Sequence, residues 1–357
     1  MKIKARQNLP LGRRARLLLC LTLGLAIFAA SSSFPPALAA TGSRSTVTQA
    51  VTQENLPGLA LKPAAAAESL QAFTRVIIGQ LSADAPFQEW KNAGTEIFPL
   101  GPGTHSWLVN VMNGEQRIGY LIISAAEDGG YLLSEYGAGT EGLPYSMSDL
   151  RQYLVQEGLL PSNYSGVIGL SALYAPLLPV WKLTIENKTL YLNASVLQVL
   201  PWSLSQADSI LSRQLDAKAL LPAGTDQQAR KPAPALLSGG QDDPYADLLW
   251  LTAPKLTAVS GPGLAALLAG RGSIAFQAAG HNGDLGSPFM ITGCQSWLPA
   301  SGGSQKSSAA AVVYAAAGPG GKRYLPLAAL QQYGSFHKPP LPLSGGTTLG
   351  AAPASKP

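Results

Sequence analysis

The sequence predicts an α+β fold of two small modules, each an antiparallel sheet with one or more packed helices. Alternating apolar runs at residues 107–112 and 117–124 flank Asn113-Gly114, a dipeptide typical of two-residue hairpin turns. Apolar residues recur at three- and four-residue steps across residues 70–81, which predicts an amphipathic helix. A stretch rich in Ala, Pro and Gly at residues 222–240 is predicted to be the linker between the modules.

The first 39 residues have the composition of a secretory signal peptide. Six basic residues precede a 14-residue apolar run at residues 17–30, and Ala37-Leu-Ala39 fits a small-residue cleavage site. The run is shorter than the roughly 20 residues that cross a bilayer, so we expect membrane contact only through an uncleaved leader. The chain is therefore predicted to be exported, with cleavage after Ala39.

The formal charge of +5 comes from this leader. Residues 40–357 keep 19 basic and 20 acidic residues, so the mature charge is about −1. Such a chain lacks the basic excess that is typical of nucleic-acid binding, and we expect no nucleic-acid partner. Cys20 leaves with the leader, so Cys294 has no intramolecular partner and the exported chain is expected to fold without an internal disulfide.

Residues 40–63 are predicted to be a flexible lead-in to the N-terminal module, residues 64–221. Ser146 and Asp149 form a capping pattern for a second helix, which Gly158 is expected to end. Ser205 and Asp208 are expected to cap a third helix that reaches Leu221. Further strands are predicted at residues 131–136, 181–185 and 189–193.

Residues 241–338 are predicted to form the C-terminal module, and residues 339–357 a disordered tail. The module is expected to contain an apolar element at residues 248–251, a helix at 262–270, strands at 273–277, 287–293 and 311–314, and a short helix at 327–333. A turn is expected at residues 281–284 (HNGD).

Glycines at residues 137–142 (GAGTEG) match the dinucleotide-binding pattern G-x-G-x-x-G directly after a predicted strand. Pyrophosphate binding needs the third glycine inside an opening helix, whereas Pro144 follows two residues later and the preceding strands are antiparallel. We therefore interpret this stretch as a structural loop and expect no cofactor.

Cys294, His281 and His337 are the candidate catalytic residues. A nucleophilic cysteine needs a histidine or a helix N-terminus that stabilises its thiolate, and spacing alone places neither beside Cys294. Cys294 follows an apolar strand, where a buried thiol is the commoner use, so we favour a structural role. The three histidines lack ligand spacing and no metal motif occurs, so no metal site is predicted.

One further motif has the spacing of an acyl-enzyme pair. Ser335 and Lys338 stand three residues apart, which would place Lys one helical turn beyond the nucleophile. Pro339 and Pro340 follow at once and exclude a helix there, so we interpret the match as chance.

Residues 263–276 (GLAALLAGRGSIAF) and 287–293 (SPFMITG) resemble the second half of bacteriocin-processing-type papain-like cysteine peptidases. That family has a helix ending in Gly, a strand, and a second strand that begins with the catalytic histidine. Ser287 and Pro288 stand at the matching positions, Cys294 replaces the aromatic residue after the glycine, and Gly318-Pro319 replaces a later Asp-Pro. The resemblance implies a degenerate papain-like module, and hence a pseudoenzyme.

The hairpins of the first module resemble those of secreted-peptidase propeptides and PepSY-type modules. The residues concerned are 119–124 (GYLIIS), 130–134 (GYLLS), Trp181 and 191–194 (YLNA). Members of these families bind or restrain peptidases through sheet surfaces, so the resemblance implies a binding role.

The sequence thus favours an exported bacterial envelope or extracellular protein that acts without catalysis, by binding an unknown protein or cell-wall component. Two alternatives stay open: a secreted cysteine peptidase or amidase that uses Cys294 with His281 or His337, and a peptidase inhibitor or propeptide-like chaperone. Exposed strand edges and four aromatic residues are the first candidate binding surfaces, although we expect most of these aromatics to belong to the core. The four are Trp107, Tyr120, Tyr131 and Tyr136.

Overall fold

The computed structural model describes residue 56 and residues 59–101, 105–126, 129–213, 227–256, 258–280, 286–300 and 311–338. The described residues form one compact unit by their contacts. Within the described residues, no helix has the length and apolar composition needed to cross a membrane. The predicted signal peptide, residues 1–39, and the tail, residues 339–357, lie outside the described residues.

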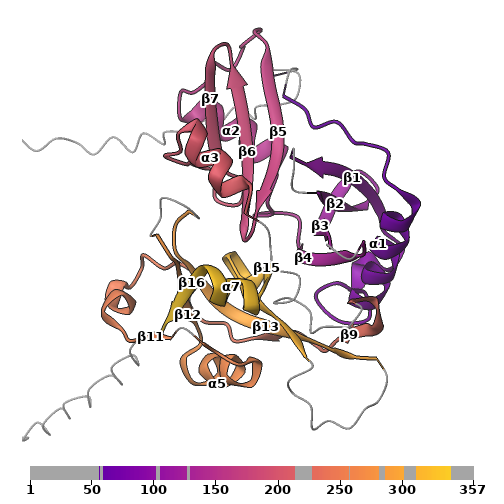
Figure 1. Cartoon of the computed structure of the whole chain (residues 1–357), viewed down its shortest axis with the longest axis vertical. Helices are drawn as coiled ribbons and strands as arrows, with labels where there is room; N and C mark the ends of the chain where they lie inside the picture. The colour runs from indigo at the N-terminus through magenta and orange to yellow at the C-terminus, as the bar shows by residue number, and fades with distance from the viewer. Residues whose placement is uncertain are drawn as a thin grey trace, which may run out of the picture. The chain divides into compact units, whose positions relative to one another are not determined.

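The α+β class is confirmed, because antiparallel sheets and α-helices build the fold (Figure 1). The larger sheet has the order β1-β2-β3-β4-β15-β14-β13-β12-β16-β11, and two short strands, β9 and β10, also pair with β13. Its strands are β1 (Gly94–Leu100), β2 (Ser106–Asn113), β3 (Gln116–Ala125), β4 (Tyr131–Ala138), β9 (Arg230–Pro232), β10 (Leu236–Leu237), β11 (Lys255–Leu256), β12 (Ile274–Ala278), β13 (Phe289–Pro299), β14 (Val312–Ala317), β15 (Arg323–Pro326) and β16 (Gly334–His337).

A second, four-stranded antiparallel sheet has the order β5-β6-β7-β8. The tight turn between β6 and β7 places Glu186 at a φ of 53°, in the left-handed region. The strands are β5 (Ile168–Ala175), β6 (Leu178–Ile185), β7 (Lys188–Asn193) and β8 (Gln198–Val199).

The helices begin and end where short polar side chains and glycines allow it. Ser146 caps α2 by accepting a hydrogen bond from the Asp149 amide at 3.3 Å, and Ser260 caps α5 through the Gly263 amide at 3.1 Å. Gly272, at a φ of 75°, ends α5. The helices are α1 (Glu68–Leu81), α2 (Met147–Gln156), α3 (Leu204–Leu211), α5 (Gly261–Arg271) and α7 (Leu327–Tyr333), with 3₁₀ turns η2 (Gln88–Asn92), η3 (Gln227–Ala229), η4 (Leu248–Thr252) and η6 (Pro319–Gly321).

The β1–β4 hairpins bury side chains on both faces. Val109 and Ile123 join the main core, which also holds the apolar stripe of α1. Their strand neighbours Leu108 and Ile122 instead pack with residues of α2 and of the second sheet. Because successive side chains alternate across a strand, each strand ties two apolar layers together.

The two predicted modules are not separate in the structure. Arg323 and Tyr324 of β15 pair with Gly137 and Tyr136 of β4, so one sheet runs through both sequence segments. The same core cluster contains residues of both segments. The predicted arrangement in two modules is therefore not confirmed, because local sequence patterns do not report strand pairing between distant segments.

The linker and lead-in predictions also need correction. Within residues 222–240, β9 and β10 pair with β13, so apolar and strand-pairing groups override a Pro- and Ala-rich composition. In the lead-in, Leu56 and Leu59 are fully buried, and the Arg151 guanidinium donates to the Leu59 carbonyl at 2.9 Å. These contacts place Leu56 and Leu59 against α2.

Helix α3 differs from its prediction at both ends. Its N-cap is Ser203, whose hydroxyl accepts from the Gln206 amide at 3.2 Å, rather than Ser205. The helix ends at Leu211, ten residues before the predicted end at Leu221, and residues 214–226 lie outside the described residues. Strands β1, β5, β15 and β16 and the short strands β8 to β11 were not predicted from the sequence.

Candidate functional site

Cys294 lies in the middle of β13, opposite Leu236 of β10 and Ala315 of β14. Its side chain is buried in the main core, and this burial raises the pKa of the thiol. A nucleophilic cysteine requires the opposite shift, toward the thiolate. The geometry therefore gives Cys294 the environment of a packing residue.

His337 is also buried, but at a different place in the sheet. It pairs with Ala275 of β12, and Ala275 pairs with Met290 of β13, four residues away from Cys294. Its ring meets the Trp250 ring edge-on, with centroids 5.2 Å apart. Burial, followed by the charge of Lys255, lowers the pKa of His337. The register thus does not bring His337 to Cys294.

The other sequence-derived candidates fall into two groups. His281 and the rest of the predicted turn at residues 281–284 lie outside the described residues. Ser335 and His337 lie on β16, an extended strand, so the Ser335–Lys338 spacing is not that of a helical turn.

The glycines at residues 137–142 serve packing and turning. A Cβ at Gly137 would lie 2.3 Å from the Lys322 carbonyl oxygen and 2.6 Å from the Tyr120 ring. Gly139 and Gly142 have φ values of 129° and 68°, which L side chains rarely adopt. The next helix begins only at Met147, so no helix N-terminus opens at this loop.

Of the four aromatic residues considered as binding surfaces, Tyr120 and Tyr136 are fully buried. Trp107 and Tyr131 are partly buried, and their rings meet edge-on at 5.8 Å. Tyr120 and Tyr136 thus belong to the core, and only Trp107 and Tyr131 retain some exposed surface.

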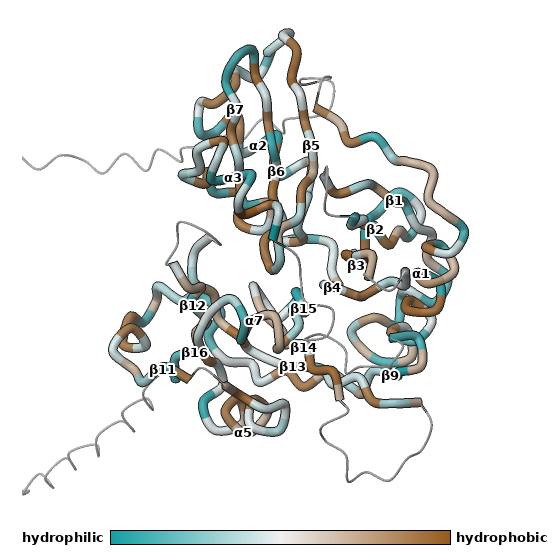
Figure 2. The backbone as a smooth tube through the Cα atoms, viewed as in Figure 1, coloured by the Kyte–Doolittle hydropathy of each residue, from teal (hydrophilic) through white to brown (hydrophobic). Residues whose placement is uncertain are grey.

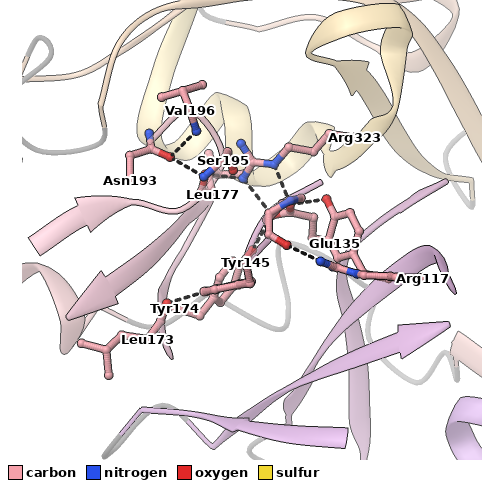
Figure 3. A network of polar contacts seen from close by, with 12 residues as sticks. Arg117, Glu135, Tyr145, Leu173, Tyr174, Leu177, Asn193, Ser195, Val196 and Arg323 are labelled. Atoms are coloured by element: carbon pink, nitrogen blue, oxygen red, sulfur yellow. Dashed lines mark hydrogen bonds and ion pairs between the residues drawn. The ribbon is translucent and has the colours of Figure 1, made fainter. Parts of the chain in front are cut away.

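Two constellations remain as candidate sites, and the first is a buried polar network around Glu135 of β4 (Figure 3). Arg323 of β15 donates from Nε to Oε1 at 2.5 Å and from Nη2 to Oε2 at 2.9 Å. The hydroxyls of Tyr120 and Tyr174 donate to the same carboxylate at 2.6 and 3.3 Å. Arg323 Nη2 also donates to the Leu177 carbonyl at 2.7 Å.

The network extends to Arg117 and Tyr145. Arg117 Nη1 donates to the Pro144 carbonyl at 2.7 Å, and burial lowers the pKa of Arg117 to about 10. The Tyr145 hydroxyl donates to the Leu173 carbonyl at 2.5 Å, and burial raises its pKa well above the ordinary value. The network joins β3, β4 and β15 to β5. Because the Glu135 carboxylate already accepts four hydrogen bonds, it has no lone pair left for a ligand.

The second constellation is an open groove beside the edge strand β1. It is a cavity of about 720 Å³, within the ~300–1,000 Å³ that is typical of ligand sites. Helix α1 forms one wall, residues 63–66 another, and η2 and β1 the remainder. We call this cavity the β1 groove. Its lining residues are Pro63, Ala64, Ala65, Ala66, Gln71, Arg75, Ile78, Gly79, Trp90, Lys91, Ala93, Gly94, Thr95, Glu96 and Ile97.

Some backbone N–H and C=O groups of β1 face the groove instead of β2. The Ile97 carbonyl accepts a hydrogen bond from the Ala64 amide at 3.2 Å, so the backbone groups of Ile97 are directed away from β2. In an antiparallel pair a residue directs its N–H and C=O to the same side, and successive residues alternate. Thr95 and Pro99 therefore also point outward. Pro99 has no amide, which blunts that end of the edge, whereas Thr95 offers both of its groups.

The α1 wall carries no side chain at Gly79, near the C-terminal end of the helix. Gln71, Arg75, Ile78 and Gly79 share one helix face, at the i, i+4, i+7 and i+8 positions. A Cβ at Gly79 would meet no atom within 4 Å, so the fold leaves room for a side chain there. Glycine is nevertheless present, at a cost of about 1 kcal/mol in helix stability relative to Ala. The missing side chain leaves room for another backbone beside the helix.

The groove is mixed in polarity. Ile78, Trp90 and Ile97 are its large apolar residues, and the first two are buried. Arg75 and Lys91 supply two exposed cations, against the one exposed carboxylate of Glu96. An apolar lining with a few polar groups is typical of a ligand-binding site.

Sequence reasoning missed this site because β1 was not predicted. Two signals could have found it: Gly79 inside a well-formed amphipathic pattern, and Pro99 in an apolar run, which marks an edge strand. Among the described residues, no cluster of His, Cys, Asp and Glu could hold a metal ion.

Comparisons with protein-family models, with curated proteins and with solved structures each find no match to this chain. The resemblances to papain-like peptidases and to PepSY-type modules therefore stay predictions.

Proposed function

We propose that this protein is an exported, non-catalytic binding protein that holds an extended segment of a partner polypeptide in the β1 groove. The partner segment would pair with the outer edge of β1 at Thr95, beside the point where the Ala64 amide already pairs with Ile97, and α1 would cover its other side. Main-chain hydrogen bonds supply affinity in this recognition mode, and pockets for alternate side chains supply specificity.

The single observation that carries the proposal is the outward edge of β1 inside a groove of about 720 Å³. The outward-facing Thr95 backbone and the bare face at Gly79 lie in the lining of the same cavity. An extended polypeptide fits both: its backbone pairs with Thr95, and it approaches α1 where no side chain stands. The export of the chain, predicted from residues 1–39, places the partner in the cell envelope or outside the cell.

Cys294 does not support the hydrolase alternative. Its thiol is buried with a raised pKa, and the strand register separates it from His337. The inhibitor alternative differs from the proposal only in the identity of the partner, since a peptidase segment could also occupy the β1 groove.

A selection from a displayed peptide library against residues 40–357 tests the proposal. Gly79→Leu projects a side chain into the groove from a position where Cβ meets no protein atom. Gly270→Leu is the matched control, because Gly270 is also helical, exposed and free of atoms within 4 Å. Selected peptides should bind the wild type and Gly270→Leu equally, and Gly79→Leu at least about 10-fold more weakly.

A second variant tests the hydrogen bonding. Thr95→Pro removes the outward amide without removing a ladder donor to β2, and it should weaken the same peptides. Selected peptides that bind all the variants equally would contradict the proposal, as would a library that yields no binder.

A further inference from the structure

A second surface, distinct from the β1 groove, exposes large apolar side chains on the turn around η4. Tyr245, Leu248, Leu249 and Leu251 are each between 51% and 58% exposed, although they lie within seven residues. Figure 2 shows this turn, next to β11, as one of the strongly hydrophobic stretches of the chain. Contiguous exposed apolar groups of this kind are typical of interaction sites.

The turn is held in place by its one buried member, Trp250. The Trp250 indole donates to the Pro244 carbonyl at 2.7 Å, and the ring packs with Ala275, Met290 and His337. The buried Trp250 fixes the backbone of the turn, while the flanking Leu249 and Leu251 stay exposed. A partner therefore meets a surface that is already ordered, which lowers the entropic cost of binding.

Aspartates order the same turn and give it a negative charge. Asp243 Oδ1 accepts from the Tyr245 amide and Asp247 Oδ1 from the Leu249 amide, both at 2.9 Å. Asp242 Oδ2 accepts from the Gly320 amide at 3.4 Å. All three aspartates are exposed, and residues 232–254 contain no Lys or Arg.

The negative charge of the aspartates distinguishes between two kinds of partner that could cover these leucines, a membrane and a polypeptide. An anionic membrane would bring negative charge next to three carboxylates, which is unfavourable. A cationic segment with an apolar face matches both features, since complementary charges fix its orientation and leucines bury its apolar side.

We propose that Tyr245, Leu248, Leu249 and Leu251, with the rim of Asp242, Asp243 and Asp247, form an acidic leucine surface that docks a cationic amphipathic helix of a partner protein. The apolar side of that helix covers the leucines, and its Lys and Arg side chains face the aspartates. This interaction is independent of the β1 groove.

Fluorescence anisotropy with residues 40–357 and a labelled amphipathic helix of Leu and Lys tests the proposal. The double variant Leu249→Ser/Leu251→Ser should weaken binding at least about 10-fold, because it removes two apolar contacts. Leu204→Ser is the matched control, since Leu204 of α3 is 63% exposed and lies outside the surface. It should leave binding unchanged.

The charge is tested separately with Asp243→Asn/Asp247→Asn, which keeps the amide-capping oxygens. This variant should weaken binding about 3-fold or more and reduce the salt dependence. Unchanged thermal unfolding of each variant shows that the turn is intact.

Three results would overturn the proposal: equal binding of a Leu/Glu helix, no loss with Leu249→Ser/Leu251→Ser, or no binding of the Leu/Lys helix at all. Co-sedimentation with anionic phosphatidylglycerol vesicles that depends on Leu249 and Leu251 would also overturn it, in favour of a lipid surface.

Discussion

Glu135 of β4 and Arg323 of β15, which are 188 residues apart in the sequence, form a bidentate ion pair. The Arg323 side chain is 14% exposed and that of Glu135 is fully buried. Burial opposes the guanidinium charge, yet the pKa of Arg323 is raised because the Glu135 carboxylate stabilises the cation. The pair thus fixes the register in which β15 joins β4.

Replacing one partner of this pair should destabilise the fold. Glu135→Gln keeps the shape of the side chain but leaves the Arg323 cation without its counter-charge, and we expect a loss of about 3 kcal/mol in the free energy of unfolding. Denaturant unfolding of residues 40–357 measures it. Glu96→Gln, at an exposed position, should stay within about 0.5 kcal/mol of the wild type. A similarly small effect of Glu135→Gln would contradict the assignment of Glu135 as the centre of the network.

His337 should make the protein sensitive to acid. Its pKa in the folded state lies below the ordinary value of 6.5, so the unfolded chain binds a proton more readily. Stability from the neutral ring is therefore fully present above pH 6.5 and is lost as the pH falls through the lower folded-state pKa.

His337→Phe keeps a ring against Trp250 and should flatten the pH dependence of unfolding below pH 6.5. His105→Asn serves as the control, because Asn tolerates the φ of 45° at that exposed position. If His337→Phe keeps the slope of the wild type, another group causes the acid sensitivity.

Gly79→Ala should stabilise the protein by about 0.5–1 kcal/mol, because the helix gains propensity and the added Cβ meets no atom. Gly272→Ala should instead destabilise the protein. Gly272 has a φ of 75°, which alanine rarely adopts, and the added Cβ would lie 3.3 Å from the Gly240 Cα. Thermal unfolding compares the two variants. A destabilising Gly79→Ala would show that the glycine serves the fold rather than the groove.

The Cys294 thiol should react slowly with alkylating reagents at neutral pH. Its burial and raised pKa keep it protonated and shielded, so labelling of residues 40–357 should become complete only in denaturant. Mass spectrometry over time measures the labelled fraction. Rapid labelling of the native chain would revive the hydrolase alternative.

Local patterns in the sequence identified the elements whose contacts are local. The Ser146 cap of α2, the apolar stripe of α1 and the hairpin of β2 and β3 were predicted, and the structure has all three, although the hairpin turn is Gly114-Glu115 rather than Asn113-Gly114. Each depends on turn chemistry or side-chain periodicity within about ten residues.

The pairing of β4 with β15 could not be predicted in the same way. Nothing near Tyr136 indicates Tyr324 as its partner, although their rings stack at 4.8 Å. The arrangement in two modules is not confirmed for this reason. The β1 groove was missed for a separate reason: β1 itself was not predicted, and a site made by an edge strand and a helix requires knowing which strand forms the edge.

Amide hydrogen exchange at β1 tests the central claim most directly. With a selected peptide at saturation, the amide of Thr95 should become protected, while that of Glu96, which faces β2, should not change. Unchanged exchange at Thr95 in the presence of bound peptide would contradict strand addition in the β1 groove.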